Sequence, residues 1–442
     1  MPLNARDVQH FCRRVGFGAS QAEINHFKGR ERADVVDEVL NLTVAMPPKP
    51  GFIQPSSTWW TQKWPTINWW MERMVDSSWT NRTASTPSPL VEKMALFWHG
   101  HFACSLDKVQ DMVPVFDLHQ LHRSHALADY ETLVRKVSTN GAALTNLDND
   151  TNVKGAEQEN FARELMELYT VGVGNFSEND VVQMARAWTG HGNHGWSSRL
   201  DARYRFNSGN HDNGSKTLFG RTQNWNGPQT VTELVKGSKR QQTARFIARK
   251  LWLYFVNGEP TDAQVQQIAS AFSNGGMSIK TAMRAILLHS AFWAETSRHA
   301  IVRCPVDWMV DVLRRTGLPV ANAEMAWLMP ISGQSLFEPP NVAGWGTHDY
   351  WISTSTTWGR GLYVDFAGWK DPVTATFAPA EAMSVDDAVD FILQKMGLDN
   401  LVSMASYQAL RSWVSTAKSG YSWSIKHNAF RVAAMLPEFQ TA

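Results

Sequence analysis

The spacing of apolar residues along this chain is helical over most of its length. In residues 20–42 they recur every three or four positions, as on one buried helix face. Ser20 is placed to cap the first turn, and Pro47 ends the segment. Similar spacing predicts helices over about 58–76, 89–104, 112–127, 130–138, 177–188, 240–256, 261–274, 278–289, 303–316, 386–396, 400–416 and 423–436.

Strand-like residues occur at 204–206 and 217–219, with Asn213-Gly214 between them. Because Asn-Gly favours a tight turn, the pattern predicts at most a small β-hairpin joining the two runs. Three segments rich in Gly, Pro, Ser, Thr, Asn and Trp lack helical spacing and are predicted to be long irregular loops: 44–57, 190–230 and 331–385.

The predicted fold class is therefore mainly α, a single large multi-helix domain over 1–442 with long loops. No Gly/Ser-rich linker divides the chain, and residues 386–442 are a candidate C-terminal helical subdomain.

Composition narrows the classes of partner and compartment. The chain has 442 residues, 43% hydrophobic, enough for a sizeable core. A net charge of +1 gives no field for nucleic acid or an anionic membrane. Three scattered cysteines, no apolar leader and no long apolar span favour a cytoplasmic protein. The expected partner is a small-molecule substrate, and the oligomeric state stays open.

Residues 97–102, Phe-Trp-His-Gly-His-Phe, end an apolar helical run with two histidines. Neutral imidazole is a good ligand for zinc, copper and iron. His99 and His101 cannot share one helical face, so their convergence on an ion requires a helix end near Gly100. The alternative is that one histidine is a hydrogen-bonded core residue and the other is exposed.

A carboxylate-rich segment, 157–167, is predicted to be helical. Glu164 and Glu167 lie three residues apart on one face, as in helix-borne metal sites, although Glu-x-x-Glu replaces the usual Glu-x-x-His. The alternative is solvated charge, with Arg163 paired to Glu159 or Glu167.

A third candidate is the His211-Asp212 pair followed by Lys216, in the loop predicted over 190–230. His211 could act as a base or a ligand, Asp212 as the carboxylate that orients it, and Lys216 as a cation for developing negative charge. We therefore expect this loop to fold over the His99 region. His119, His122 and His125 recur every third residue and are interpreted as a polar helix stripe, with metal binding as the less favoured alternative.

Several familiar motifs are absent. Ser215 stands before Lys216 where a phosphate loop needs glycine, and no Gly-x-Ser-x-Gly or His-Glu-x-x-His occurs. The 20 tryptophans fill core or line a pocket for a sugar or an aromatic substrate.

Five stretches in order along the chain resemble the large bacterial family DUF1800, a domain of unknown function. They are residues 10–19 (HFCRRVGFGA), 97–102 (FWHGHF), 159–168 (ENFARELMEL), 211–217 (HDNGSKT) and 339–345 (PPNVAGW). The resemblance implies a mostly helical protein of one family-length unit in which the His, Glu, Asp and Lys positions above recur. It implies no particular activity.

The leading hypothesis is a metal-dependent oxidoreductase acting on a small organic substrate. In it, iron or copper is bound by His99, His101, Glu164 and His211, with His211, Asp212, Lys216 and Glu159 as catalytic residues. One alternative is a zinc hydrolase in which Glu159 or Asp212 is the base. Another is a non-enzymatic helical protein that binds a glycan or a protein through its tryptophan-rich loops.

Overall fold

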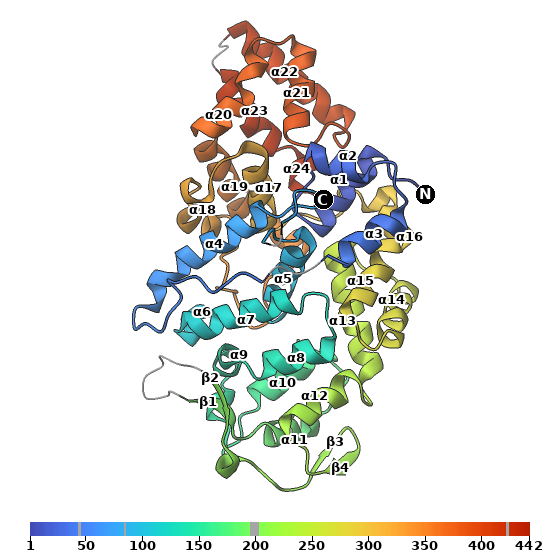
Figure 1. Ribbon diagram of the computed structural model, residues 1–442, viewed down its shortest axis with the longest axis vertical. Helices are drawn as coiled ribbons and strands as arrows, with labels where there is room; N and C mark the ends of the chain where they lie inside the picture. Colours follow the sequence, from blue (N-terminus) through green and yellow to red (C-terminus); the bar gives the residue numbers. More distant parts are fainter. Residues whose placement is uncertain (43–45, 84, 195–202, 421–423) are drawn as a thin grey trace.

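The helices predicted from apolar spacing are present in the computed structural model, which describes residues 1–42, 46–83, 85–194, 203–420 and 424–442. In these ranges the protein is mainly α-helical, and its strands form two small two-stranded sheets (Figure 1). The predicted fold class is confirmed.

The helices of the first half are α1 (Ala5–Val15), α2 (Gln21–Phe27), α3 (Arg32–Leu40), α4 (Lys63–Val75), α5 (Pro89–His101), α6 (Leu106–Val109), α7 (Met112–Ser124), α8 (Tyr130–Ser138), α9 (Gly141–Asn146), α10 (Asn160–Glu167) and α11 (Glu178–Ala187). Those of the second half are α12 (Gly227–Val235), α13 (Arg240–Phe255), α14 (Asp262–Asn274), α15 (Ile279–Leu288), α16 (Ser290–Trp293), α17 (Pro305–Thr316), α18 (Met325–Ile331), α19 (Thr354–Ala367), α20 (Asp371–Phe377), α21 (Val385–Lys395), α22 (Met404–Gly420), α23 (Ser424–Ala434) and α24 (Pro437–Gln440).

The segment 20–42 forms two helices, so the prediction of one is wrong. Ser20 does cap α2, in a capping box with Glu23. The chain then turns at Gly29, whose φ of +82° lies in the left-handed region that glycine adopts without strain. The apolar residues of α2 and α3 are buried on both sides of this turn, which is why their spacing resembles one continuous helix.

The predicted hairpin is also wrong. β2 (Arg203–Phe206) pairs antiparallel with β1 (His191–His194), while β3 (Lys216–Leu218) pairs with β4 (Arg221–Gln223). The tight turn is Phe219-Gly220, where both φ angles are positive, as a two-residue hairpin turn requires. Asn213-Gly214 instead lies in a loop whose Gly214 amide donates to Asp212.

The segment 331–385 is irregular only in its first part, since α19 and α20 occupy much of the rest. Ser, Thr and Gly give α19 little helix propensity of its own. It packs against α18 and α23, and Ser353 closes a capping box at its start. Tertiary contacts therefore stabilise a helix that local sequence does not reveal.

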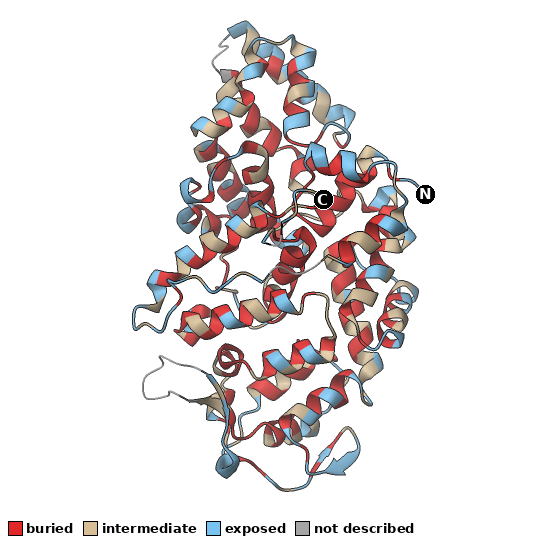
Figure 2. Ribbon diagram, viewed as in Figure 1, coloured by how far each residue is buried: buried red, intermediate tan, exposed pale blue. Residues whose placement is uncertain are grey.

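Buried residues form a continuous core that runs from Leu3 to Phe439. Figure 2 shows the buried faces of the helices turned toward one another throughout the molecule. α21, α22 and α23 pack together at the upper end in Figure 1, and α17 contacts α20 below them. The described residues contain no helix with the length and apolar character needed to cross a bilayer.

Candidate functional site

His99 lies near the end of α5 and is buried. Its Nε2 accepts a hydrogen bond from the backbone amide of Phe337 at 3.0 Å, and its ring lies 5.4 Å from that of Trp345. Desolvation lowers the pKa of His99 to about 3, so the ring is neutral. His99 therefore joins α5 to the chain segment that follows α18.

His101 contacts a different set of groups. Its Nε2 lies 3.0 Å from the hydroxyl of Tyr130 and 3.3 Å from the carbonyl oxygen of Tyr169. The Tyr130 hydroxyl itself donates to that carbonyl, so Nε2 carries the ring proton. Nδ1 then accepts a hydrogen bond from the Lys250 amine at 3.1 Å. Both nitrogens of His101 are engaged by protein groups.

Glu159 and Glu164, the two glutamates of the predicted site, lie at or near α10, which begins only after Glu159. Glu159 is exposed and pairs with Arg163 four residues on, as the alternative interpretation predicted. Glu164 is half-buried, and desolvation raises its pKa.

His211, Asp212 and Lys216 tie one loop together. His211 Nδ1 lies 2.8 Å from the carbonyl of Thr189, and Asp212 pairs with Arg186 at 2.6 Å. The Lys216 amine donates to the carbonyls of Asp212 and Gly214. This loop joins β2 to β3 at the lower end of Figure 1, away from α5. The expectation that it covers His99 is wrong, because its polar groups are satisfied by its own neighbours.

The four predicted ligands are thus not brought together. Among the described residues, no group of three or more His, Cys, Asp or Glu side chains is arranged to hold a metal ion. A metal bound by His99, His101, Glu164 and His211 does not fit this arrangement, and metal dependence stays a prediction.

The interpretation of residues 119–125 as a polar stripe is wrong for two of its three histidines. His119 and His122 are buried, and the His119 Nε2 accepts a hydrogen bond from the Arg123 guanidinium group at 2.9 Å. Neither nitrogen of His122 has a hydrogen-bond partner among the described residues.

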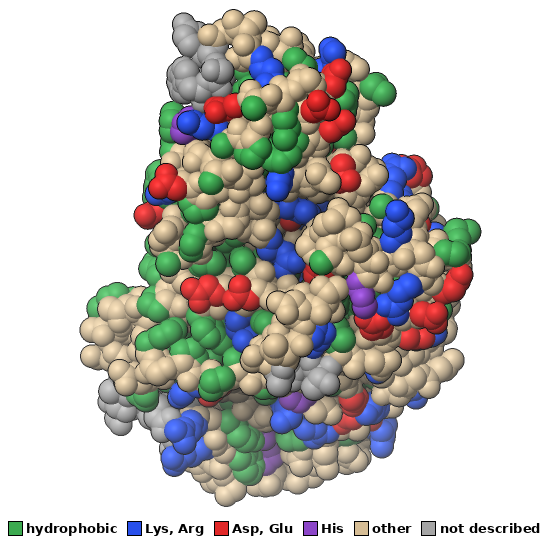
Figure 3. Space-filling view, turned by 45° about the horizontal axis from the view of Figure 1, so that its top comes forward, with side chains coloured by type: hydrophobic (Ala, Val, Ile, Leu, Met, Phe, Trp, Pro, Cys, Tyr) green, Lys and Arg blue, Asp and Glu red, His purple; other side chains and the backbone are tan. Residues whose placement is uncertain are grey.

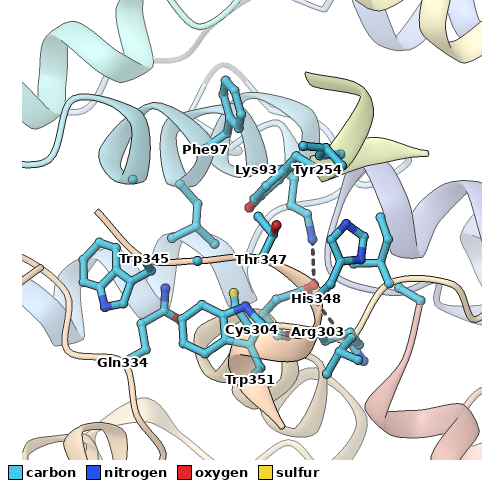
Figure 4. Close-up of a pocket in the computed structure, with 18 of the residues that line it drawn as sticks. Lys93, Phe97, Tyr254, Arg303, Cys304, Gln334, Trp345, Thr347, His348 and Trp351 are labelled. Carbon is cyan, nitrogen blue, oxygen red and sulfur yellow. Dashed lines mark hydrogen bonds and ion pairs between the residues drawn. The ribbon is translucent and has the colours of Figure 1, made fainter. Parts of the chain in front are cut away.

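The structure places other residues around a central cavity of about 260 Å³ (Figure 4). Aromatic side chains from separate elements line it: Phe97, Tyr254, Trp345 and Trp351. Basic side chains line it as well: Arg13, Arg14, Lys93, Lys250 and Arg303. Figure 3 shows basic side chains gathered in a hollow near the middle of the molecule.

Two of the five cations are neutralised by a carboxylate. Lys93 pairs with Asp307 at 2.7 Å, and Arg303 pairs with Asp307 at 3.1 Å and with Asp311 at 2.8 Å. Among the described residues that line the cavity, Asp307 is the one acidic side chain.

Arg13 and Arg14 have no such partner. Their guanidinium groups donate to backbone carbonyls, of Glu438 for Arg13 and of Phe255 and Ser297 for Arg14. Nε and Nη2 of Arg13 and Nε of Arg14 are buried and lack partners among the described residues. Desolvation lowers both pKa values to about 9, so the protein holds these cations at an energetic cost.

The end of α5 and the segment 337–348, here called the cavity loop, meet at this site. Gly344 has a φ of +81°, and a Cβ there would lie 2.1 Å from the carbonyl oxygen of Gly100. His348 follows, with a φ of +52° and a buried Nε2 that has no partner among the described residues. The FWHGHF and PPNVAGW motifs are therefore in contact at the cavity wall.

Sequence reasoning missed Arg13, Arg14, Lys250 and His348. A signal existed for the arginines, since two adjacent cations interrupt the apolar run of α1. Lys250 lies on a helix with several other basic residues, so its partial burial in the cavity wall is visible only in the folded protein.

Fold and site together define a mainly α-helical protein with a central cavity lined by cations and aromatic rings. Residues 10–441 match the family model described as protein of unknown function (DUF1800), and the chain belongs to this family. No curated protein and no solved structure matches the chain.

Proposed function

We propose that this protein is an enzyme whose substrate is a small organic anion with an aromatic or other flat apolar body, bound in the central cavity. The observation that carries the proposal is the pair Arg13 and Arg14, buried at the cavity wall without a carboxylate partner. A buried charge without a counter-ion costs several kcal/mol, about 3–5 where one has been removed. A bound anion would offset that cost.

The chemistry of the walls supports this class of ligand. A guanidinium group offers a planar pair of donors that matches a carboxylate or phosphate. Phe97, Trp345 and Trp351 supply flat apolar surface for the rest of the molecule. The volume, about 260 Å³, lies just below the usual range of small-molecule sites, which begins at about 300 Å³, and suits a compound with one ring.

The small organic substrate expected from the sequence is retained, and the metal is not required. No step is assigned to a metal, because the predicted ligands are engaged elsewhere. Elemental analysis of protein purified without chelator or nickel resin tests the metal prediction separately: stoichiometric iron or copper supports the oxidoreductase hypothesis, and zinc alone supports the hydrolase.

Titration of tryptophan fluorescence with benzoate and with phenyl phosphate tests the anion site, since Trp345 and Trp351 line the cavity. Arg13→Met should weaken benzoate binding at least tenfold, about 1.4 kcal/mol. Its melting temperature should stay equal or rise, because an unpaired buried charge is removed. Neutral benzamide should bind the wild type much more weakly than benzoate.

Arg245→Met is the matched control, because Arg245 is a partly exposed residue of α13 that pairs with Asp262. It should bind benzoate as the wild type does. Equal affinity of the Arg13→Met variant and the wild type, or equal affinity for benzamide and benzoate, would refute the anion site.

A further inference from the structure

We propose that the Lys250 amine forms an imine with a carbonyl group of the ligand, so that the substrate class is an oxo acid. The inference rests on the proposed function for the carboxylate part of that ligand. The Lys250 amine is a separate group, which would bind the carbonyl part of the ligand.

The contacts of Lys250 distinguish it from the other lysine of the cavity. Lys93 is held by the Asp307 carboxylate at 2.7 Å, which stabilises its ammonium form. The Lys250 amine has neutral partners instead, His101 Nδ1 at 3.1 Å and the carbonyl of Leu168 at 3.2 Å. It also lies 4.9 Å from the ring centre of Phe246. No carboxylate pairs with it among the described residues.

The surroundings of the Lys250 amine favour its attack on a carbonyl group. The amine lines the cavity, no carboxylate holds it as an ammonium group among the described residues, and His101 Nδ1 is placed to accept a proton from it. Desolvation in a cavity is a known means of activating lysine as a nucleophile toward carbonyl compounds.

The hydrogen bond to His101 provides a route for the protons. The amine nitrogen attacks the carbonyl carbon, and the electrons of the C=O π bond move to oxygen. One N–H proton passes to His101 Nδ1 and then to that oxygen, which gives the carbinolamine. The second N–H proton leaves with the hydroxyl group as water, and the C=N bond forms. Both amine protons end in the water released, and no oxidant or reductant is needed.

His101 is held ready for this exchange. Its Nε2 proton is directed at the Tyr169 carbonyl and the Tyr130 hydroxyl, which leaves Nδ1 as the acceptor that faces the amine. In the proposed step His101 therefore both holds the amine and relays its proton to the carbonyl oxygen.

The remaining walls select the rest of the ligand. Arg13 and Arg14 face the same cavity and can take a carboxylate, and the aromatic rings can take the side group. Benzoylformate combines a ring, a ketone and a carboxylate in one small molecule, so it is a suitable probe.

The experiment incubates the full-length protein with benzoylformate and cyanoborohydride, which reduces an imine to a stable amine, and follows the adduct by intact mass and peptide mapping. One adduct per chain is expected, at Lys250, because this amine lines the cavity without a carboxylate partner among the described residues. Benzaldehyde, which lacks the carboxylate, should react more slowly at this site.

Lys250→Met and Lys250→Arg should each lower the adduct yield at least tenfold; the arginine variant keeps the cation should the methionine variant fold poorly. Lys136→Arg, an exposed residue of α8, is the control and should react as the wild type does. Adducts spread over surface lysines, or undiminished yield in both Lys250 variants, would overturn the imine. If benzoate binds through Arg13 and Lys250 stays unmodified, the imine proposal fails and the anion site stands. If Lys250 is modified and benzoate does not bind, the anion site fails and the imine proposal stands.

Discussion

At the scale of single residues, the best-supported feature outside the cavity is the buried carboxylate of Glu92. It lies on α5 and accepts two hydrogen bonds from Arg123 of α7, at 2.9 and 2.8 Å. The indole of Trp70, on α4, donates to it at 3.0 Å, and Arg73 lies 3.4 Å away. Burial acts to raise the pKa of Glu92, but Arg123, Arg73 and Trp70 together outweigh it, and the pKa falls below its ordinary value.

Replacing Glu92 by Gln should destabilise the protein by about 3–5 kcal/mol, because Arg123 would remain buried without its counter-ion. Urea unfolding followed by circular dichroism measures the effect. Glu159→Gln removes only an exposed ion pair with Arg163 and should cost about 0–1 kcal/mol. Equal stability of these two variants would contradict the role assigned to Glu92.

At the scale of elements, the cavity depends on the contact between the end of α5 and the cavity loop. His99 accepts the Phe337 amide at the start of this loop, and Gly344 meets the Gly100 carbonyl seven residues later. The loop carries Trp345 and His348 into the cavity wall. A short stretch of backbone thus determines where one whole side of the site lies.

Gly344→Ala should disrupt that contact, since its Cβ has no room and its φ of +81° is strained for any other residue. A stability loss of about 1–3 kcal/mol is expected, with a clear loss of benzoate affinity. Gly361→Ala, within α19 with open space at its Cβ, should leave binding unchanged and stabilise by about 0.5–1 kcal/mol. Wild-type affinity in the Gly344 variant would show that the loop does not position the site.

At the scale of the whole molecule, several histidines are buried in the neutral form. Desolvation is the main cause that lowers the pKa of each of these: His10, His99, His101, His119 and His122. Their unfolded forms bind a proton near pH 6.5, and their folded forms do so only at lower pH. Folding stability from these groups is therefore complete above about pH 6.5 and is lost as the pH falls below it.

Stability should fall steeply between about pH 6.5 and 4.5, by up to about 1.4 kcal/mol per pH unit for each such histidine. Melting temperatures across this range measure it. His122→Phe should reduce the dependence of stability on pH by the contribution of one histidine, up to about 1.4 kcal/mol per pH unit. The variant should fold, because the His122 nitrogens have no partners among the described residues and the ring is already stacked on Phe102. A melting temperature that is constant from pH 6.5 to 4.5 would contradict this account.

Local sequence determined most of the helices, because three- and four-residue spacing and serine caps such as Ser20 and Ser177 act within one or two turns. It also marked His99 and His101 as polar groups in an apolar run that need partners. Local spacing did not predict the break at Gly29, because it depends on a single backbone angle. It did not predict α19 either, because that helix is stabilised by its contacts with α18 and α23.

The partners themselves were decided by the tertiary structure. His99 meets an amide 238 residues away, and His101 meets a lysine 149 residues away, so neither could be paired from local spacing. The same holds for the cavity, because Arg13, Lys250 and Trp345 come from distant parts of the chain. An arginine or a lysine has the same side chain on a surface or in a core, and only burial without a carboxylate makes it a candidate site for an anion or a carbonyl group.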